Sequence, residues 1–346
     1  MRKILFIGDL HLGKHWLGVD LLEEQRDILL TQIPAHCAAK QPDIVVVCGD
    51  IFDSIHPRKG ALELWEAFLG LLARRNIELV VISGNHDNTS LIEYGSSLFP
   101  TNINIAAETK TALVKEFGDV RIVAVPFVRP TDFNVDSYMD AVCVAVRGVE
   151  EDDSKFNILV THNQYGGLGY DDNERLANDG VCEREGFKQS FDLVVAGHIH
   201  KPEDDENFHY VGSIMPFTFA EAGPHRCLLF EIDGKKIVQH DLPLKPKYDI
   251  LDVVVEELTD DIELPTDKYI RIKTQKTDHL LEQRLKKRYP LLLKIEKPKR
   301  DYVMDFQDMD FQHRTDQELI ESYYEQVLGS QDKEQIRKLV NRLCVS

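Results

Sequence analysis

The chain opens with Ile4-Leu5-Phe6-Ile7-Gly8-Asp9-Leu10-His11, an apolar run that ends abruptly in residues able to bind a metal. A short apolar run of this kind is typical of a buried strand in a mostly parallel sheet. Open α/β sheets place their functional groups beyond the carboxyl ends of such strands. The opening stretch therefore predicts an α/β fold with Asp9 and His11 at the functional edge of its sheet.

The same arrangement recurs four more times. Apolar runs at residues 44–48, 79–82, 158–160 and 193–196 each lead directly into polar residues. The residues at the five strand ends that could bind a metal are Asp9, His11, Asp50, Asn85, His162, His198 and His200. Their recurrence at the ends of successive strands favours a single metal centre on one edge of the fold.

The number and type of these ligands predict two ions. A single ion rarely takes more than about six ligands from a site of mixed nitrogen and oxygen character, so two ions that share Asp50 explain the set best. Asp9 and His11 are one residue apart, as are His198 and His200, so on an extended chain each pair would point the same way and clasp one cation. Ligation without sulfur favours Mn²⁺, with Fe²⁺, Mg²⁺ and Zn²⁺ as alternatives.

Each motif taken alone has an ordinary alternative. Asp9-x-His11 could be a chance pair in a surface loop, and Gly84-Asn85-His86-Asp87 could be a turn. The two histidines of Gly197-His198-Ile199-His200 could be unrelated. Cys48 precedes its turn, within the apolar run, and is expected in the core rather than in the metal centre.

The ordered set of motifs resembles a known family. Its members in this chain are Asp9-x-His11, Gly49-Asp50-x-x-Asp53, Gly84-Asn85-His86-Asp87, His162 and Gly197-His198-x-His200. The set resembles the calcineurin-like metallophosphoesterases, and the sequence around the motifs is most similar to that of the nuclease subunit of the SbcCD and Mre11–Rad50 complexes. The resemblance covers roughly residues 1–245 and includes Tyr210-Val211-Gly212-Ser213. It implies two packed mixed β-sheets flanked by helices.

The resemblance also implies roles for the site residues. One ion would be held by Asp9, His11, Asp50 and His200, and the other by Asp50, Asn85, His162 and His198. His86 would approach the scissile phosphate, where an imidazole can exchange protons near neutral pH. Asp53 or Asp87 would orient such histidines. The alternative for His86 is a turn histidine that bonds only to backbone.

Composition sets the class of protein. A chain of 346 residues with 43% apolar and 29% charged residues is expected to form one large core and a smaller module. The first strand supplies Asp9 at once, so a cleavable signal peptide would remove the site, and no apolar stretch approaches the length of a membrane span. Six scattered cysteines lack disulfide or metal spacing, which indicates a reducing cytoplasm.

The net charge of −18 opposes a nucleic-acid partner, since DNA-binding proteins are usually basic. Residues 268–300, however, hold twelve Lys and Arg against three Asp and Glu, a local excess of 12 − 3 = +9. This segment could contact the DNA backbone or be an ordinary solvated face. The candidate DNA contacts are His56, Arg58, Lys273, Arg284 and Lys287.

The resemblance implies three parts along the chain: a nuclease domain at 1–245, a capping domain that positions DNA at 246–300, and a C-terminal helical segment at 301–346. Helical patterns at 21–39, 61–75 and 134–148 separate the strands of the first part. The capping domain is expected to hold strands at 250–255, 269–274 and 291–296 and a helix at 279–289. By resemblance, the first two helices would form a homodimer.

The C-terminal segment is predicted to dock a partner. Thr315-x-x-Glu318 is a capping box before an apolar helical stripe, and a second amphipathic helix follows Gly329. The resemblance implies docking on an SbcC/Rad50-like ATPase, and the alternative is that the tail packs on its own domain. No G-x-x-x-x-G-K-[ST] motif occurs in this chain, so ATP hydrolysis would belong to the partner.

These observations together predict a Mn²⁺-dependent DNA exonuclease and endonuclease that works in DNA recombination, repair and replication. A small-molecule phosphodiesterase or nucleotide-diphosphate hydrolase of the same superfamily is the alternative, because it would use the same ligands. A protein phosphatase is disfavoured because Ser54 follows Asp53, where that subfamily has Arg-Gly. A third alternative is a scaffold in which the metals only stabilise protein contacts.

Overall fold

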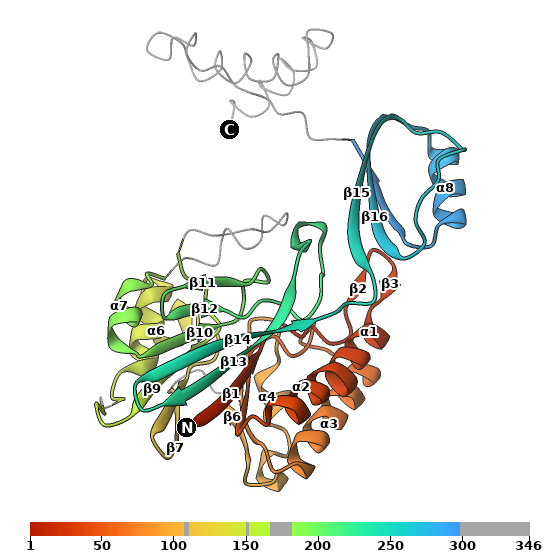
Figure 1. The fold of residues 1–346 in the computed structure, drawn as a ribbon. Coiled ribbons are helices and arrows are strands. Elements are labelled where there is room, and N and C mark those ends of the chain that lie inside the picture. The colour runs from red at the N-terminus through yellow and green to blue at the C-terminus, as the bar shows by residue number, and fades with distance from the viewer. Residues whose placement is uncertain (107–110, 150–151, 167–181, 298–346) are drawn as a thin grey trace, which may run out of the picture. The chain divides into compact units, whose positions relative to one another are not determined.

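The computed structural model describes residues 1–106, 111–149, 152–166 and 182–297 (Figure 1). The chain divides into one unit at Met1–Glu296 and another at Lys297–Ser346. The predicted tail helices and the end of the basic segment, residues 298–300, lie outside the described residues.

Two six-stranded mixed sheets form the larger part of the first unit. The first sheet has the order β14-β13-β1-β4-β5-β6. Its strands are β1 (Arg2–Ile7), β4 (Ile44–Cys48), β5 (Glu78–Ile82), β6 (Ile103–Ala106), β13 (His225–Asp233) and β14 (Lys236–Leu244). Strands β1, β4, β5 and β6 run parallel, and β13 and β14 pair antiparallel.

The second sheet has the order β11-β12-β10-β9-β8-β7. Its strands are β7 (Leu113–Phe117), β8 (Val120–Ala124), β9 (Phe156–Thr161), β10 (Leu193–Ala196), β11 (Glu203–Asp205) and β12 (Phe208–Tyr210). Strands β8, β9, β10 and β12 run parallel, whereas the edge strands β7 and β11 are antiparallel. The five predicted strands therefore exist, but they are shared between two sheets.

Alternation of side chains along each central strand builds two apolar layers. On β1, Ile4 and Phe6 join the core between the two sheets, while Leu5 and Ile7 join the core beneath the helices. Because successive strand residues point to opposite faces, a strand that is apolar throughout can be buried on both sides. Cys48 lies in the layer between the sheets, as the sequence predicts.

Helices cover the outer face of each sheet (Figure 1). The first sheet is covered by α1 (Leu22–Asp27), α2 (Ile33–Lys40) and α3 (Lys59–Arg74). The second is covered by α6 (Tyr138–Val146) and α7 (Glu185–Ser190), and the short helices α4 (Thr89–Glu93) and α5 (Pro130–Phe133) lie in connections. The architecture is thus two packed mixed sheets flanked by helices, which confirms the predicted fold class.

Two predicted helices are interrupted. The helix expected at 21–39 contains a π-helical turn, Ile28–Gln32, in which the Ile33 N–H donates to the Ile28 carbonyl. Pro34 explains the turn, because its ring has no N–H and crowds the carbonyl four residues earlier. The helix expected at 134–148 starts only at Tyr138, because Asn134 ends α5 in a left-handed conformation and Ser137 caps α6.

Residues 249–296 form a separate three-stranded parallel sheet, in the order β15 (Asp249–Glu257), β16 (Lys268–Lys276) and β17 (Leu292–Glu296). Helix α8 (His279–Arg288) packs on it through Leu281 and Leu285. The predicted elements of this module therefore exist, with β15 and β16 extending further at both ends than expected.

Contacts join this module to the larger part of the unit. The Tyr269 hydroxyl donates to the buried Glu24 carboxylate, and the Tyr269 ring lies 5.1 Å from that of Trp16. Trp16 belongs to a two-stranded hairpin, β2 (His15–Trp16) and β3 (Val19–Asp20), that follows the loop of His11. Among the described residues, no helix is long and apolar enough to cross a membrane.

Candidate metal centre

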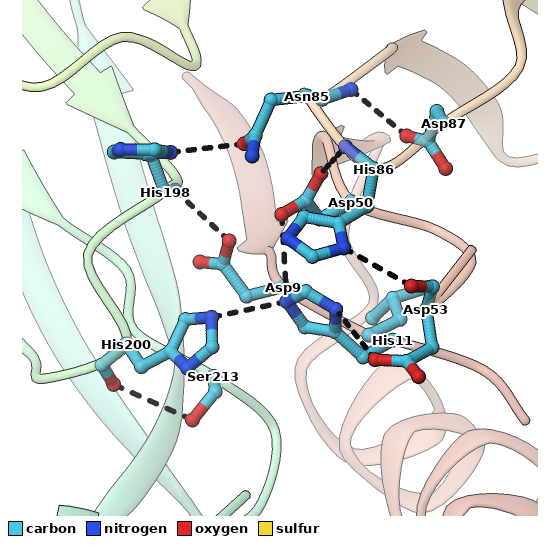
Figure 2. A network of polar contacts seen from close by, with 12 residues as sticks. Asp9, His11, Asp50, Asp53, Asn85, His86, Asp87, His198, His200 and Ser213 are labelled. Atoms are coloured by element: carbon cyan, nitrogen blue, oxygen red, sulfur yellow. Dashed lines mark hydrogen bonds and ion pairs between the residues drawn. The ribbon is translucent and has the colours of Figure 1, made fainter. Parts of the chain in front are cut away.

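The predicted ligands lie in the loops that follow β1, β4, β5, β9 and β10. Parallel pairing places the carboxyl ends of β1, β4 and β5 at one edge of the first sheet, and those of β9 and β10 at one edge of the second. Figure 2 shows side chains from the two sheets converging on a common space, with Asp50 and Asp9 between His198, His200 and His11. All seven predicted ligands take part in the contacts of this cluster.

Asp50 lies at the centre of the cluster. Its Oδ2 atom is 3.4 Å from Nε2 of His11 and 3.3 Å from Nε2 of His162. Its Oδ1 atom accepts the backbone N–H of His86 at 2.9 Å. Oδ2 therefore faces two imidazoles that come from different sheets.

Backbone contacts fix the orientation of His162. Its Nδ1 atom lies 2.6 Å from the carbonyl oxygen of Cys48. Since a carbonyl can only accept, Nδ1 carries a hydrogen and Nε2 is the ring nitrogen left to bind a metal. Nε2 lies 3.3 Å from Asp50 Oδ2 and 3.9 Å from Asp9 Oδ1.

His198 and His200 contact different partners. Nδ1 of His198 lies 3.0 Å from Oδ1 of Asn85, and the His198 backbone N–H donates to Asp9 at 2.9 Å. Nε2 of His200 lies 3.0 Å from Nε2 of His11. The expectation that the two histidines bind one cation together stays a prediction.

Three groups of side chains have ligand atoms within 4.8 Å of one another in the described part of the chain: Asp9, His11 and His200; Asp9, Asp50 and His162; and His11, Asp53 and His86. Asp9 belongs to two of these groups and lies in the buried interior of the cluster. All three groups could hold an ion; the first two consist only of predicted ligands, whereas the third includes Asp53 and His86.

The donor atoms of the cluster fit a divalent metal. Oδ2 of Asp9, Nε2 of His162 and Nε2 of His198 are buried and have no hydrogen-bond partner within the described residues. A buried polar atom without a partner costs free energy, and the ligand atoms of Asp9 and His162 lie within 4.8 Å of one another and of Asp50, which indicates a binding site. Burial lowers the pKa of His11 to about 4 and that of His198 to about 3, so both imidazoles are neutral at pH 7 and offer lone pairs.

The imidazoles of His162 and His200 make metal binding depend on pH. Burial alone would lower the pKa of His162, but Asp50 outweighs it and raises the pKa to about 9. Glu221 raises the pKa of His200 to about 9 in the same way. A metal must displace protons from both imidazoles below this pH. We therefore expect Mn²⁺ to bind more tightly as the pH rises from 6 to 8, by about tenfold per pH unit for each displaced proton, as measured by equilibrium dialysis.

The backbone of the ligand loops is strained. Asp9, His11, Asp50 and His198 have φ values of 49°, 42°, 49° and 82°, in the left-handed region that residues other than glycine rarely adopt. Such conformations cost about 1–3 kcal/mol each and concentrate at functional sites. The expectation that Asp9 and His11 lie on an extended chain is wrong, because β1 ends at Ile7 and a turn aims both side chains inward.

The glycines of two motifs are explained by close approach. A side chain at Gly49, whose φ is 87°, would overlap the ring of His162. A side chain at Gly84 would overlap the carboxylate of Asp50. The Gly-Asp and Gly-Asn-His motifs therefore need glycine because another ligand occupies the space of its missing side chain.

Asp53 and Asp87 differ in what they support. Asp53 Oδ1 lies 3.5 Å from Nδ1 of His11, and the Asp53 backbone carbonyl lies 3.0 Å from Nδ1 of His86. Asp87 instead accepts the backbone N–H groups of residues 51, 52 and 84 at 2.8–3.1 Å, so of the two carboxylic residues it is Asp53 that contacts histidines. It ties together the loops after β4 and β5, and burial, reinforced by Asp50, raises its pKa to about 7.

Sequence reasoning missed two residues beside the cluster. The carboxylate of Glu221 lies 3.0 Å from Nδ1 of His200, and the ammonium group of Lys14 lies 2.7 Å from Asp53. Glu221 ends a Thr-x-x-Glu pattern that starts at Thr218 and signals a helix start, but nothing in its spacing links it to His200. Only the fold brings the two together.

Carboxylates pair with most of the candidate DNA contacts. Arg58 bonds to Asp20, Lys273 lies 3.0 Å from Asp252, and Arg284 lies 2.9 Å from Asp260. His56 lies in the exposed loop after Asp53, and Lys287 is exposed on α8. Acidic residues thus neutralise part of the basic segment. For the paired cations, this favours an ordinary solvated face over a contact with the DNA backbone.

The chain matches a known family and a curated relative. A family model described as calcineurin-like phosphoesterase matches residues 2–202. The chain is 29% identical over 372 aligned positions to the SbcD subunit of the SbcCD nuclease from Staphylococcus epidermidis, with 98% of each chain covered.

Two solved structures are also similar to this chain. TT1561 of Thermus thermophilus has a TM-score of 0.41 and 10% identity, over 69% of this chain and 98% of that one. Purple acid phosphatase PPD1 from yellow lupin (Lupinus luteus) has a TM-score of 0.39 and 13% identity, over 69% of this chain and 51% of that one. With the family model matching more than half of the residues, the chain belongs to the calcineurin-like phosphoesterase family and is a metal-dependent phosphodiester hydrolase.

Proposed function

We propose that this protein is a Mn²⁺-dependent DNA nuclease that holds two metal ions and works with an SbcC-like ATPase in DNA recombination, repair and replication. The observation that carries the proposal is the position of Asp50 Oδ2, 3.4 Å from Nε2 of His11 and 3.3 Å from Nε2 of His162. The similarity to a nuclease subunit over 98% of the chain supports DNA as the substrate. We also propose a cytoplasmic location, which the six cysteines without disulfide spacing support.

In this proposal the ligands divide as the family resemblance implies. Asp9, His11, Asp50 and His200 hold one ion, and Asp50, Asn85, His162 and His198 hold the other. A pair of divalent ions supplies positive charge that stabilises the attacking and leaving oxygens of an in-line displacement. The mixed oxygen and nitrogen ligands suit Mn²⁺, with Fe²⁺, Mg²⁺ and Zn²⁺ as alternatives.

His86 is the proposed proton donor. Its Nδ1 atom lies 3.0 Å from the backbone carbonyl of Asp53, so Nδ1 carries a hydrogen and Nε2 is the atom left to face a substrate. Its backbone N–H is held by Asp50 at 2.9 Å, which couples the position of His86 to the centre of the cluster. Protonation of the leaving 3′ or 5′ oxygen by Nε2 would lower the barrier to cleavage.

The proposed contact with the DNA backbone lies on α8. Lys286, Lys287 and Arg288 are consecutive and exposed in its last turn. Cations near a helix C-terminus are also favoured by the helix dipole. The cations on β16 are less suited to DNA, because Lys268, Arg271 and Lys276 lie beside acidic residues of β15.

A nuclease assay separates this proposal from its main rival. We expect Mn²⁺-dependent degradation of linear duplex DNA and of circular single strands, together with turnover of a generic phosphodiester dye. A small-molecule phosphodiesterase would need neither the basic module nor the tail. Turnover of the dye without DNA cleavage, with the ATPase partner present, would support that rival and contradict the nuclease proposal.

The C-terminal segment is the proposed docking site for the ATPase. We expect deletion of residues 315–346 to leave a folded chain that binds Mn²⁺ and hydrolyses the dye, because the described metal centre lies wholly within residues 9–221. The same deletion should abolish retention of the SbcC-like ATPase in a pull-down. An unfolded product would instead support a tail that packs on its own domain.

A further inference from the structure

We propose that Glu221 is a positioning residue that fixes His200 for metal binding. Its carboxylate is nine-tenths buried and lies 3.0 Å from Nδ1 of His200. The proposal rests on the metal centre proposed above, and it adds a residue that lies outside the seven ligands.

The contacts of Glu221 define its charge state. Oε1 accepts from His200 Nδ1 and from the Thr218 hydroxyl, both at 3.0 Å, and Oε2 accepts the Phe217 backbone N–H at 2.9 Å. Three donors aimed at one carboxyl group suit an ionised carboxylate, which only accepts. The buried carboxylate therefore has a satisfied, fixed geometry.

This geometry fixes the orientation of the imidazole. With Nδ1 bonded to Glu221, His200 presents Nε2, which lies 3.0 Å from Nε2 of His11. His11 and His200 form one group with Asp9 in which the ligand atoms lie within 4.8 Å of one another. Glu221 therefore supports the ion that this group would hold.

The imidazoles assigned to the other ion are backed differently. Nδ1 of His162 contacts the neutral carbonyl of Cys48, and Nδ1 of His198 contacts the amide oxygen of Asn85, which is itself a proposed ligand of that ion, so neither Nδ1 faces a carboxylate. A carboxylate behind a metal-binding imidazole raises its basicity more than a neutral group does. Loss of Glu221 should therefore weaken the ion held by His11 and His200 and spare the other.

The segment that carries Glu221 is rigidly held. Phe219–Glu221 form a 3-10 helix capped by the side chain of Thr218. The ring of Phe219 lies 4.8 Å from that of Trp16, and the guanidinium of Arg271 lies over it at 4.8 Å. A side chain anchored this way can hold an imidazole in one orientation.

The test compares the full-length chain with Glu221→Gln, which removes the charge, and Glu221→Asp, which shortens the reach. Glu206→Gln is the matched control. Glu206 is exposed in the turn between β11 and β12, away from the ligand loops, and its carboxylate lies 2.9 Å from the ammonium group of Lys188. Mn²⁺ affinity is measured by equilibrium dialysis. Electron paramagnetic resonance distinguishes an exchange-coupled Mn²⁺ pair from a single ion, and thermal unfolding of the metal-free proteins reports folding.

We expect both Glu221 variants to lose about 10–100-fold in affinity at one site while the other site is unchanged. The coupled signal should then appear only at higher Mn²⁺ concentration, whereas the control behaves like the parent chain. Unchanged affinities with a coupled signal in either variant would overturn the inference, as would equal weakening of both sites, which a purely structural role predicts. A parent chain that binds no Mn²⁺ pair would overturn the metal centre itself, and this inference with it.

Discussion

Replacement of Asp50 by Asn is expected to reduce phosphodiester hydrolysis by about 10³-fold or more, because several kcal/mol of electrostatic stabilisation depend on a charge that two ions share. Asp50 is almost fully buried, and although burial opposes ionisation, the imidazoles of His162 and His11 hold its pKa well below the usual value. The amide of Asn keeps the size of the side chain but removes this charge. The measurement is the rate of dye and DNA cleavage, together with the number of Mn²⁺ ions retained on dialysis.

The matched control is Asp233→Asn. Asp233 is exposed at the hairpin between β13 and β14 and pairs with the N-terminal amine. An exposed ion pair contributes little, so this variant should keep full activity and both ions. Two retained ions and near-normal cleavage in Asp50→Asn would show that Asp50 is not the shared ligand.

Replacement of His86 by Ala is expected to lower the turnover of DNA by about 10²–10⁴-fold while Mn²⁺ binding is unchanged. His86 is absent from the seven proposed ligands, and its ring lies 4.8 Å from that of His11, at the edge of the cluster. Removal of a proton donor affects the chemical step alone. The rates and the Mn²⁺ affinity of the variant are measured side by side.

The loss of activity in His86→Ala should depend on the leaving group of the substrate. An ester with an acidic phenol as leaving group needs little protonation, so His86→Ala should slow it much less than it slows DNA. His279→Ala, which removes an exposed histidine at the start of α8, is the matched control. Equal losses on both substrates would rule out proton donation to the leaving oxygen and leave charge stabilisation as the role of His86.

The strands, and the polar residues that meet beyond their ends, could be predicted because both depend on local pattern. Ile4 to Ile7 are buried on both faces, so the run is apolar throughout, and the glycine that follows marks its end. The ligand types at the strand ends then indicate a metal. The strands of residues 249–296 could be predicted as well, since apolar and polar residues alternate along each strand and turn residues mark its ends.

Other features depend on contacts between distant segments. The turn that aims Asp9 and His11 inward arises from hydrogen bonds of the backbone at residues 9–12 to carbonyls at residues 49–51, which no local pattern shows. Glu221 reaches His200 only because the segment after β12 folds back over the loop after β10. The ion pairs between β15 and β16 likewise follow from their register, so the sequence alone overstates the free charge of the basic segment.

The most direct test of a shared Asp50 carboxylate is anomalous diffraction from crystals soaked in Mn²⁺. We expect two adjacent anomalous peaks, both within bonding distance of Asp50, one beside His11 and His200 and the other beside His162 and His198. Absence of any peak next to Asp50, or a lone ion bound elsewhere, would contradict the shared-carboxylate centre.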